Sequence, residues 1–269
     1  MKDIILSVQG MNKRFGAVYA ANDINVDVKK GSCIGLIGSN GAGKTTFVNM
    51  VTGYLKPDSG IIKFHGNDIT ELSPREVSRK GIARSFQIPQ LYGSMTALEN
   101  LEMSFGVVAL NAAKKSFFIR PENPVPGYDG KSIKELADET LDRFGLIEFR
   151  NQTTKNLPGG VRKLIDIAMA MATKPEILFL DEPTSGVSAE EKFDIMDMVM
   201  NVIKREGTTV LFVEHDMEIV SRHADRVLAF YDGSIIVDDR PEVTLKNPQV
   251  LKYIVGSAHD LNVEANNHA

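Results

Sequence analysis

Short apolar runs separated by turn residues fill the first third of the chain. Four such runs are rich in β-branched residues and are bounded by Gly, Asn and Lys: Ile4–Val8, Ile24–Val28, Ser32–Ile37 and Gly60–His65. This pattern is typical of β-strands and predicts a β-rich N-terminal region. Cys33 lies in the third run, where we expect a small buried residue in a strand and not a reactive thiol.

The middle of the chain changes character. From about residue 74 to residue 156 the pattern becomes helical and irregular. It includes the stretch PENPVPGYDGKS at 121–132, whose three prolines and two glycines predict a loop. We therefore expect a helical insertion in the middle of the fold.

The second half of the chain alternates between helices and strands. Apolar positions predict a helix through Leu164 and Met171, a strand at Ile177–Leu180, a helix from Phe193 to Ile203, and a strand at Val210–Val213. Two further runs, 227–231 and 234–237, flank the dipeptide DG, which is a hairpin signal. The fold class is α/β, with an antiparallel β region near the N-terminus and a helical subdomain at about 88–170. The polar residues 257–269 are expected to form a frayed tail.

Charge and composition narrow the function classes. The net charge is −4, which argues against a nucleic-acid binder with a basic face. The longest apolar runs are too short to cross a bilayer, and the N-terminus shows no secretory signal. One cysteine excludes a multi-cysteine metal site. We expect a cytoplasmic protein whose membrane connection comes through a partner.

The strongest chemical signal is GSNGAGKT, residues 38–45, which fits the pattern G-x-x-x-x-G-K-[ST] of a phosphate-binding loop. It follows a predicted strand and opens a predicted helix. Glycines let backbone amides close around phosphate oxygens, and the helix N-terminus adds its positive end. Lys44 would reach the β- and γ-phosphates, and the Thr45 hydroxyl would hold Mg²⁺.

Two adjacent carboxylates follow the apolar strand at 177–180. Asp181 suits a contact to Mg²⁺, and Glu182 would orient and deprotonate an attacking water. Adjacent acids after a strand are usually a solvated loop. Together with the phosphate-binding loop, the catalytic interpretation is favoured.

Two further side chains are weaker candidates. His215 follows the strand at 210–213, at the end of a strand where open α/β sheets bind ligands, so we expect a γ-phosphate contact. Gln87 lies where the core gives way to the helical insertion and is a candidate for the Mg²⁺ and water shell.

Together these motifs resemble the nucleotide-binding subunits of ATP-binding-cassette (ABC) transporters. The resemblance covers roughly residues 3–256 and rests on the order of the phosphate-binding loop, Gln87, LPGGV at 157–161, Asp181-Glu182 and His215. The segments GIARSFQIPQLYGSMTALENL (81–101) and NPQVLKYIVG (247–256) are similar to the ATP-binding proteins of branched-chain amino acid uptake systems.

The resemblance implies ATP and Mg²⁺ as cofactors and ATP hydrolysis as the activity. It implies adenine stacking on Phe15, for which a core phenylalanine is the structural alternative. The expected nucleotide-binding residues are Phe15, Gly38, Ser39, Asn40, Gly41, Ala42, Gly43, Lys44, Thr45, Thr46, Gly159 and Gly160. The expected Mg²⁺ ligands are Thr45, Gln87 and Asp181, and the expected catalytic residues are Glu182, His215, Gln87 and Lys44.

The resemblance also implies partners. Two ATP-binding subunits would face each other head to tail, each ATP lying between one subunit's phosphate loop and the other's signature turn. Integral-membrane permease subunits would dock on the cytoplasmic face of the cell membrane, with a solute-binding protein acting indirectly. The regions 87–95 and 117–132 are the candidates for permease docking. No nucleic-acid partner is expected.

The chain departs from the family pattern in the signature turn. Pro158 and Val161 stand where the family usually has Ser and Gln, so a hydroxyl donor to the partner's γ-phosphate is lost. A hydrogen bond to a charged group contributes about 1.5–3 kcal/mol. The Gly159 and Gly160 amides remain, and proline suits a helix start. We expect the second ATP-binding subunit to be a different chain, whose phosphate loop would face this weaker turn.

A second departure follows Glu182. Ser188 replaces an aspartate of the family pattern, but Ser188 and Glu191 form a predicted capping box ahead of a helix that Gly207 would end. Three alternatives stay open: a soluble cassette ATPase acting on another macromolecule, a nucleotide-binding subunit with little hydrolysis, and an exporter subunit that handles lipid.

Overall fold

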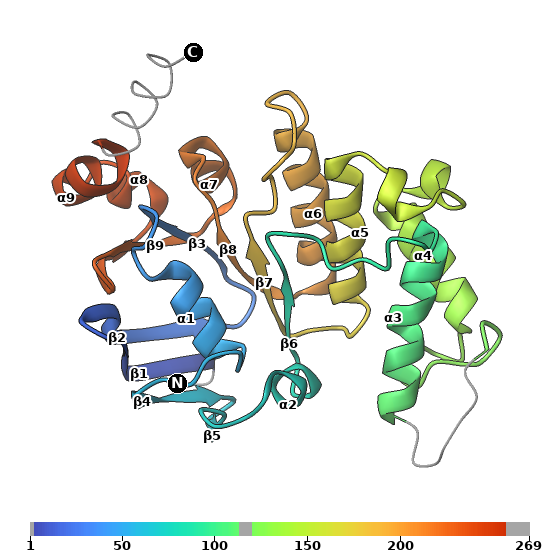
Figure 1. Ribbon diagram of the computed structural model, residues 1–269, viewed down its shortest axis with the longest axis horizontal. Helices are drawn as coiled ribbons and strands as arrows, with labels where there is room; N and C mark the ends of the chain where they lie inside the picture. The colour runs from blue at the N-terminus through green and yellow to red at the C-terminus, as the bar shows by residue number, and fades with distance from the viewer. Residues whose placement is uncertain (1–2, 113–119, 257–269) are drawn as a thin grey trace. The chain divides into compact units, whose positions relative to one another are not determined.

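In the computed structural model, which describes residues 3–112 and 120–256, the N-terminal strands form an antiparallel sheet (Figure 1). Its strand order is β2-β1-β4-β5, with bounds β1 Ile4–Phe15, β2 Val18–Lys29, β4 Ser59–Phe64 and β5 Asn67–Asp68. The first two strands are much longer than the sequence predicts, because β1 turns directly into β2 at residues 16–17 and the two pair along their whole length with several register shifts.

This sheet belongs to the first of two compact units. Unit 1 contains residues 1–82 and 209–269, and unit 2 contains residues 83–208. The predicted tail at 257–269, and residues 117–119 of a predicted docking region, lie outside the described residues. The helices α3 and α4 and most of α5 fall within 88–170, and these bounds for a helical subdomain stay a prediction.

Parallel strands form the buried centre of unit 1. β3 (Cys33–Gly38) pairs in parallel with β8 (Thr209–Val213) and with β9 (Arg226–Tyr231). Every residue of β3 and β8 is buried, as expected for strands covered on both faces. Cys33 is 4 % exposed in β3, so its prediction as a buried strand residue is confirmed.

The predicted hairpin is also present. β9 pairs antiparallel with β10 (Ser234–Asp239), and Asp232 and Gly233 both have positive φ in the turn. The helices of unit 1 are α1 Lys44–Val51, α2 Pro74–Arg79, α7 Met217–His223, α8 Pro241–Thr244 and α9 Pro248–Val250, followed by a π-helical turn at Leu251–Val255.

Unit 2 is mainly helical. Its helices are α3 Ala97–Ala112, α4 Ile133–Arg143, α5 Gly159–Met171 and α6 Lys192–Glu206, with 3₁₀ turns at Ile147–Phe149 and Thr154–Asn156. Helix α3 packs against α4 and α5 (Figure 1). The prediction that Gly207 ends a helix is confirmed, since Gly207 is left-handed at the C-cap of α6. Ser188 and Glu191 are hydrogen-bonded through their side chains, and α6 begins directly after them.

Two strands of unit 2 carry functional candidates at their ends. β7 (Ile177–Asp181) is buried throughout, as predicted, and pairs with β6 (Ile82–Ser85). The sequence analysis missed β6 and placed residues 74–156 in helices and irregular structure. Four residues are too few to show a periodicity, and partnership with a distant strand stabilises the segment.

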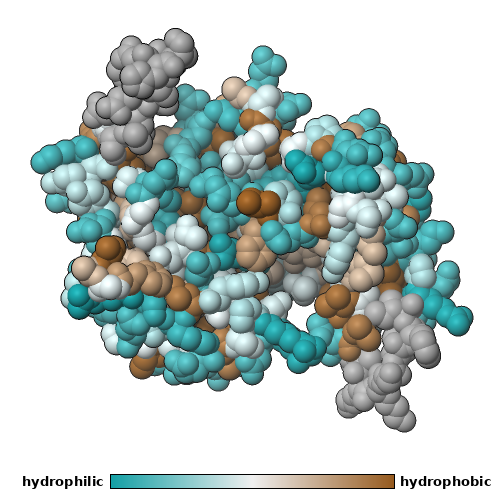
Figure 2. Space-filling model, in the orientation of Figure 1, coloured by the Kyte–Doolittle hydropathy of each residue, from teal (hydrophilic) through white to brown (hydrophobic). Residues whose placement is uncertain are grey.

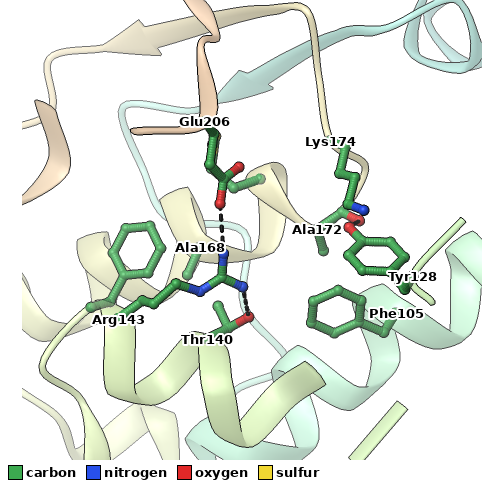
Figure 3. Close-up of a pocket in the computed structure, with 10 residues that line it drawn as sticks. Phe105, Tyr128, Thr140, Arg143, Ala168, Ala172, Lys174 and Glu206 are labelled. Carbon is green, nitrogen blue, oxygen red and sulfur yellow. Dashed lines mark hydrogen bonds and ion pairs between the residues drawn. The ribbon is translucent and has the colours of Figure 1, made fainter. Parts of the chain in front are cut away.

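A small cavity lies in unit 2, and Figure 3 shows the polar and apolar side chains that line it. Its volume of about 30 Å³ is close to the space that one water occupies. Arg143 donates to Glu206 at 2.6 Å, and the Tyr128 hydroxyl donates to the Ala172 carbonyl at 2.6 Å. Burial raises the pKa of Tyr128 to about 12, so this hydroxyl stays a donor. Hydrogen bonds among these lining residues and to the backbone thus stabilise this part of unit 2.

Candidate nucleotide site

The predicted phosphate-binding loop lies between β3 and α1 of unit 1. The strand ends at Gly38 and the helix begins at Lys44, which is the context that the motif requires. Lys44 is 6 % exposed, and its ammonium group donates to the carbonyls of Gly38 at 2.7 Å and Ser39 at 3.0 Å. The cation is thus held inside the loop, while Thr45 is exposed at the start of α1.

Gly43 shows why the loop needs glycine beside the lysine. It is the N-cap of α1 with φ 105°, and a Cβ atom there would lie 2.5 Å from the carbonyl oxygen of Ala20. No L-residue with a side chain fits this conformation and this space without a backbone shift. The close approach to β2 therefore fixes where the helix starts.

Phe15 and His215, the other two candidates of unit 1, are both exposed. Phe15 is 53 % exposed at the end of β1, with the Lys13 ammonium 5.7 Å from its ring centroid. Its alternative as a core phenylalanine is therefore wrong. His215 follows β8 directly, as predicted, and the buried Glu214 accepts a hydrogen bond from the His215 backbone amide. The ring of Phe15 is available for stacking.

The two predicted carboxylates stand at the end of β7 in unit 2. Asp181 is the buried last residue of the strand, and Glu182 is half-buried with φ 45°. A left-handed conformation is uncommon for a glutamate, and such residues cluster at functional sites. The chain turns sharply there, so the Asp181 carboxylate is buried while the Glu182 carboxylate is half-buried.

The structure brings Gln87 to Glu182. The Gln87 side-chain amide donates to Glu182 Oε2 at 2.7 Å, although 95 positions separate the two residues. The weakest candidate from the sequence is therefore a direct partner of the predicted base.

Arg84 is a functional candidate that the sequence analysis missed. It lies in β6, and its guanidinium donates to Asp181 Oδ2 at 2.6 Å, with both side chains less than 10 % exposed. A buried charge needs such a partner, and removing either side chain would break this ion pair. Only the pairing of β6 with β7 reveals this contact, because nothing in the local sequence around Arg84 indicates it.

The turn at 157–161 opens α5 in unit 2. Pro158 is the N-cap with φ −53° and ψ 154°, and Gly159 begins the helix. Pro158 is exposed, and Gly159, Gly160 and Val161 are half-buried. The predicted helix start at a proline is therefore present, with the first backbone amides of a 13-residue helix behind it.

The candidate ligands fit Mg²⁺ better than a metal held by the protein alone. Over the described parts of the chain, no group of three or more His, Cys, Asp or Glu side chains could hold a metal ion. Mg²⁺ is usually bound through one or two carboxylates together with substrate phosphates and waters. The predicted ligands have this character: unit 2 supplies the carboxylate of Asp181 and the amide of Gln87, and unit 1 supplies the hydroxyl of Thr45.

Comparison with known proteins agrees with these features. A model of the ABC transporter family matches residues 21–185, which is more than half of the chain. The chain belongs to the ABC transporter family. No helix among residues 3–112 and 120–256 of this ABC protein is long and apolar enough to span a membrane.

The relatives extend over nearly the whole chain. This ABC protein is 34 % identical over 256 residues to the high-affinity branched-chain amino acid transport ATP-binding protein BraF of Pseudomonas aeruginosa, covering 94 % of this chain and 98 % of that protein. It is 35 % identical over 266 residues to a probable branched-chain amino acid transport ATP-binding protein, LivG, of Archaeoglobus fulgidus, covering 97 % and 98 %. The predicted resemblance is confirmed.

Solved structures confirm the fold class. An ATP-binding cassette of an ABC transporter aligns with a TM-score of 0.79 and 32 % identity, covering 93 % of this chain and 98 % of that one. The ADP conformation of such a cassette aligns with a TM-score of 0.77 and 30 % identity over the same shares.

Proposed function

We propose that this chain binds and hydrolyses MgATP to power solute import through separate membrane permease subunits. The observation that carries the proposal is the glycine-rich loop between β3 and α1 with the Lys44 ammonium held inside it. Such a loop directs backbone amides and one cation at phosphate oxygens. The relatives' names indicate the process that ATP hydrolysis powers, because those relatives are named as ATP-binding proteins of branched-chain amino acid transport.

The residues of the chain divide the chemistry among them. The loop amides and Lys44 bind the β- and γ-phosphates. Thr45, Gln87 and Asp181 are the residues that would hold Mg²⁺, which would supply positive charge to the phosphates. Glu182 accepts a proton from the attacking water. The Gln87 amide, which donates to Glu182, orients this carboxylate.

Two exposed rings complete the proposal. Phe15 stacks on adenine, which its 53 % exposure supports. His215 contacts the γ-phosphate, which its exposure after β8 supports. Adenine and the γ-phosphate are the two ends of the nucleotide. Both rings are exposed, so a ligand can reach them without rearrangement of the core.

A second ATP-binding subunit faces this one head to tail, with the amides of Gly159 and Gly160 directed at the partner's nucleotide. Because Pro158 supplies no hydroxyl, the site that relies on this turn is the weaker one. The phosphate loop, Glu182 and His215 of this chain keep their chemistry. We propose that the partner is a different chain, which restores a complete signature turn opposite Lys44.

The permease docks on unit 2, at the cytoplasmic face of the membrane. Apolar side chains there are exposed beside Gln87: Ile88 is 74 % exposed and Tyr92 is 48 % exposed. Helix α3 presents Met103, Val107 and Leu110 at helical spacing, each at least 40 % exposed. Figure 2 shows apolar groups among polar ones on the face that it draws. Ile88 and Tyr92 lie within the predicted docking region 87–95, and they support that region as the docking surface.

The branched-chain amino acids are the first candidate solutes because the relatives are named for them. A solute-binding protein delivers the solute to the permease and touches this chain only indirectly. The alternative of a subunit with little hydrolysis rests on Pro158, Val161 and Ser188. Glu182 with its Gln87 partner favours an active enzyme.

The deciding experiment compares wild type with Glu182→Gln. MgATP turnover should fall by about 10²–10⁴-fold, because a general base is removed, while ATP binding persists. Light scattering of Glu182→Gln with and without MgATP then reports the dimer. A dimer seen only with MgATP means that the backbone of the signature turn suffices for self-pairing. A monomer that still binds ATP points to a different partner chain.

A wild-type protein that binds MgATP without turnover, alone and with its permease and partner subunits, would make the chain a binding module. Full-rate transport by a homodimer of this chain with its permease would contradict the non-identical partner. Purification with a permease separates the transporter proposal from a soluble ATPase that acts on another macromolecule.

A further inference from the structure

Lys163 is a buried cation that none of the proposed roles uses. It lies in α5, one helical turn after Gly159, and is 1 % exposed. Its ammonium donates to three backbone carbonyls: Phe86 at 2.5 Å, Gln87 at 3.3 Å and Asp181 at 2.9 Å. Burial of an ammonium is costly, and lysines are almost never fully buried without partners. The three carbonyls offset this cost and tie α5 to the backbone at residues 86–87 and 181.

Asp166 holds the other end of the same segment. Three residues after Lys163 on α5, its carboxylate accepts hydrogen bonds from the Ser85 hydroxyl, the Phe86 amide and the Gln90 amide, at 2.6, 3.2 and 2.9 Å. Burial raises the pKa of Asp166, while the Ser85 hydrogen bond and the Lys163 charge act in the opposite direction. Two opposite charges on one face of α5 thus fix residues 85–90 through their backbone.

Two of the carbonyls that Lys163 binds lie at or next to the hydrogen-bonded residues Gln87 and Glu182. One is the carbonyl of Gln87, and another is that of Asp181, directly before Glu182. The side chains of Gln87 and Glu182 are hydrogen-bonded to each other at 2.7 Å. The ammonium therefore connects the backbone of Gln87 with the backbone of Asp181. It also orients the peptide between Asp181 and Glu182, which has a left-handed conformation.

We propose that Lys163 is a positioning residue for ATP hydrolysis, which sets the place of the Glu182 carboxylate relative to Gln87. This inference rests on the proposed role of Glu182 as the base. Lys163 touches neither nucleotide nor water in this account. It acts because a general base must be held in its productive position, and a misplacement of about 1 Å can cost about 10²-fold in rate.

The test replaces Lys163 with methionine, which has a similar length and no donor. We expect kcat to fall about 10- to 100-fold. KM and the dissociation constant of a fluorescent ATP analogue should change less than about threefold, because the phosphate loop is untouched. Lys163→Arg keeps the charge and the donors and should recover part of the lost kcat.

Two controls separate positioning from loss of stability. Lys174 also donates to a backbone carbonyl of unit 2, that of Gly127 at 2.8 Å, but it lies exposed, with its ammonium 3.7 Å from the Tyr128 ring centroid. Lys174→Met should keep wild-type kcat. Ile165→Ala removes a fully buried side chain from α5 and should lower Tm without a comparable loss of kcat.

A double-mutant cycle with Gln87→Ala gives the sharper result. If Lys163 acts by positioning the pair, Lys163→Met should cost clearly less in the Gln87→Ala background than in wild type. Should Lys163→Met fail to fold, Asp166→Asn replaces it in the same cycle, since it loosens residues 85–90 from the other side. The same pattern is expected.

The inference is overturned by a kcat of Lys163→Met within about twofold of wild type, or by losses that multiply independently in the cycle. A kcat loss that follows Tm across Lys163→Met and Ile165→Ala also overturns it. These results differ from failure of the proposed function, in which wild type itself has no MgATP turnover for any variant to lose.

Discussion

The chain has two glycine-rich turns that each open a helix, and they use glycine for different physical reasons. In the phosphate loop of unit 1, Gly41 and Gly43 have positive φ, 80° and 105°. In the signature turn of unit 2, Gly159 and Gly160 do not belong to the positive-φ residues. Conformation requires glycine in the first turn. In the second, only space favours glycine: a Cβ on Gly160 would lie 2.8 Å from Ile195 Cδ1, the far end of a side chain that can shift.

The difference teaches how each turn tolerates change. A backbone that only glycine can adopt leaves no room for substitution, whereas a turn limited by a neighbouring side chain can be relieved by changing that neighbour. The phosphate loop has kept its motif residues. The turn at 157–161 has the glycines of the family pattern that the chain resembles, but Pro158 and Val161 stand where that pattern has Ser and Gln.

The largest effect is expected from Gly43→Ala. The left-handed strain and the 2.5 Å approach to the Ala20 carbonyl together should lower the free energy of unfolding by about 2–5 kcal/mol and abolish nucleotide binding. Urea denaturation and binding of a fluorescent ATP analogue measure both. Gly41→Ala is the matched control, since its φ is also positive but its Cβ would meet nothing within 4 Å. We expect only about 1–2 kcal/mol there. Equal losses at both positions would show that strain alone decides.

An intermediate effect is expected from Pro158→Ser, which restores a hydroxyl to the signature turn. In the Glu182→Gln background, the MgATP concentration that drives dimerisation should fall about 10- to 100-fold, because a hydrogen bond to a charged phosphate is gained. Light scattering over a titration of MgATP measures it. Pro158→Ala removes the ring without adding a donor. If both variants behave alike, the proline ring and not the missing hydroxyl weakens the turn.

The smallest effect is expected from Gly160→Ala. The nearest atom is the end of the Ile195 side chain, which can shift, and alanine is the better helix former by about 1 kcal/mol. The free energy of unfolding should therefore change by less than about 1 kcal/mol. Adding Ile195→Val should make the change favourable. Gly159→Ala tests the limit of this reasoning, because its Cβ would lie 3.0 Å from the Gly186 carbonyl oxygen, and a backbone atom yields less easily than a side chain.

Local patterns predicted the features that local physics determines. The phosphate loop, the buried strand that holds Cys33 and the hairpin turn at Asp232 all depend on a few neighbouring residues, and each is present. The predicted Ile4–Val8 strand was too short because the long β1–β2 hairpin is stabilised by pairing across its length.

Contacts over long distances in the chain could not be predicted in this way. Arg84 meets Asp181, and Lys163 meets Phe86, across 97 and 77 positions. Their residue types are ordinary for a strand and an amphipathic helix, so no local pattern marks them. The one signal in residues 157–171 is the pair Lys163 and Asp166, two opposite charges three positions apart among the apolar residues of a predicted helix.

Helix α5 carries both the proposed signature turn and the proposed positioning lysine. Its first turn presents Gly159 and Gly160, and its next turn holds Lys163 against the backbone of Gln87 and Asp181. A helix of 13 residues does not stretch, so any displacement at its N-terminus is carried to the lysine. In the proposed head-to-tail pair, a nucleotide that displaces one subunit's turn would therefore also displace the lysine that positions the same subunit's Glu182. ATP binding at one proposed site and hydrolysis at the other would then be coupled mechanically through α5.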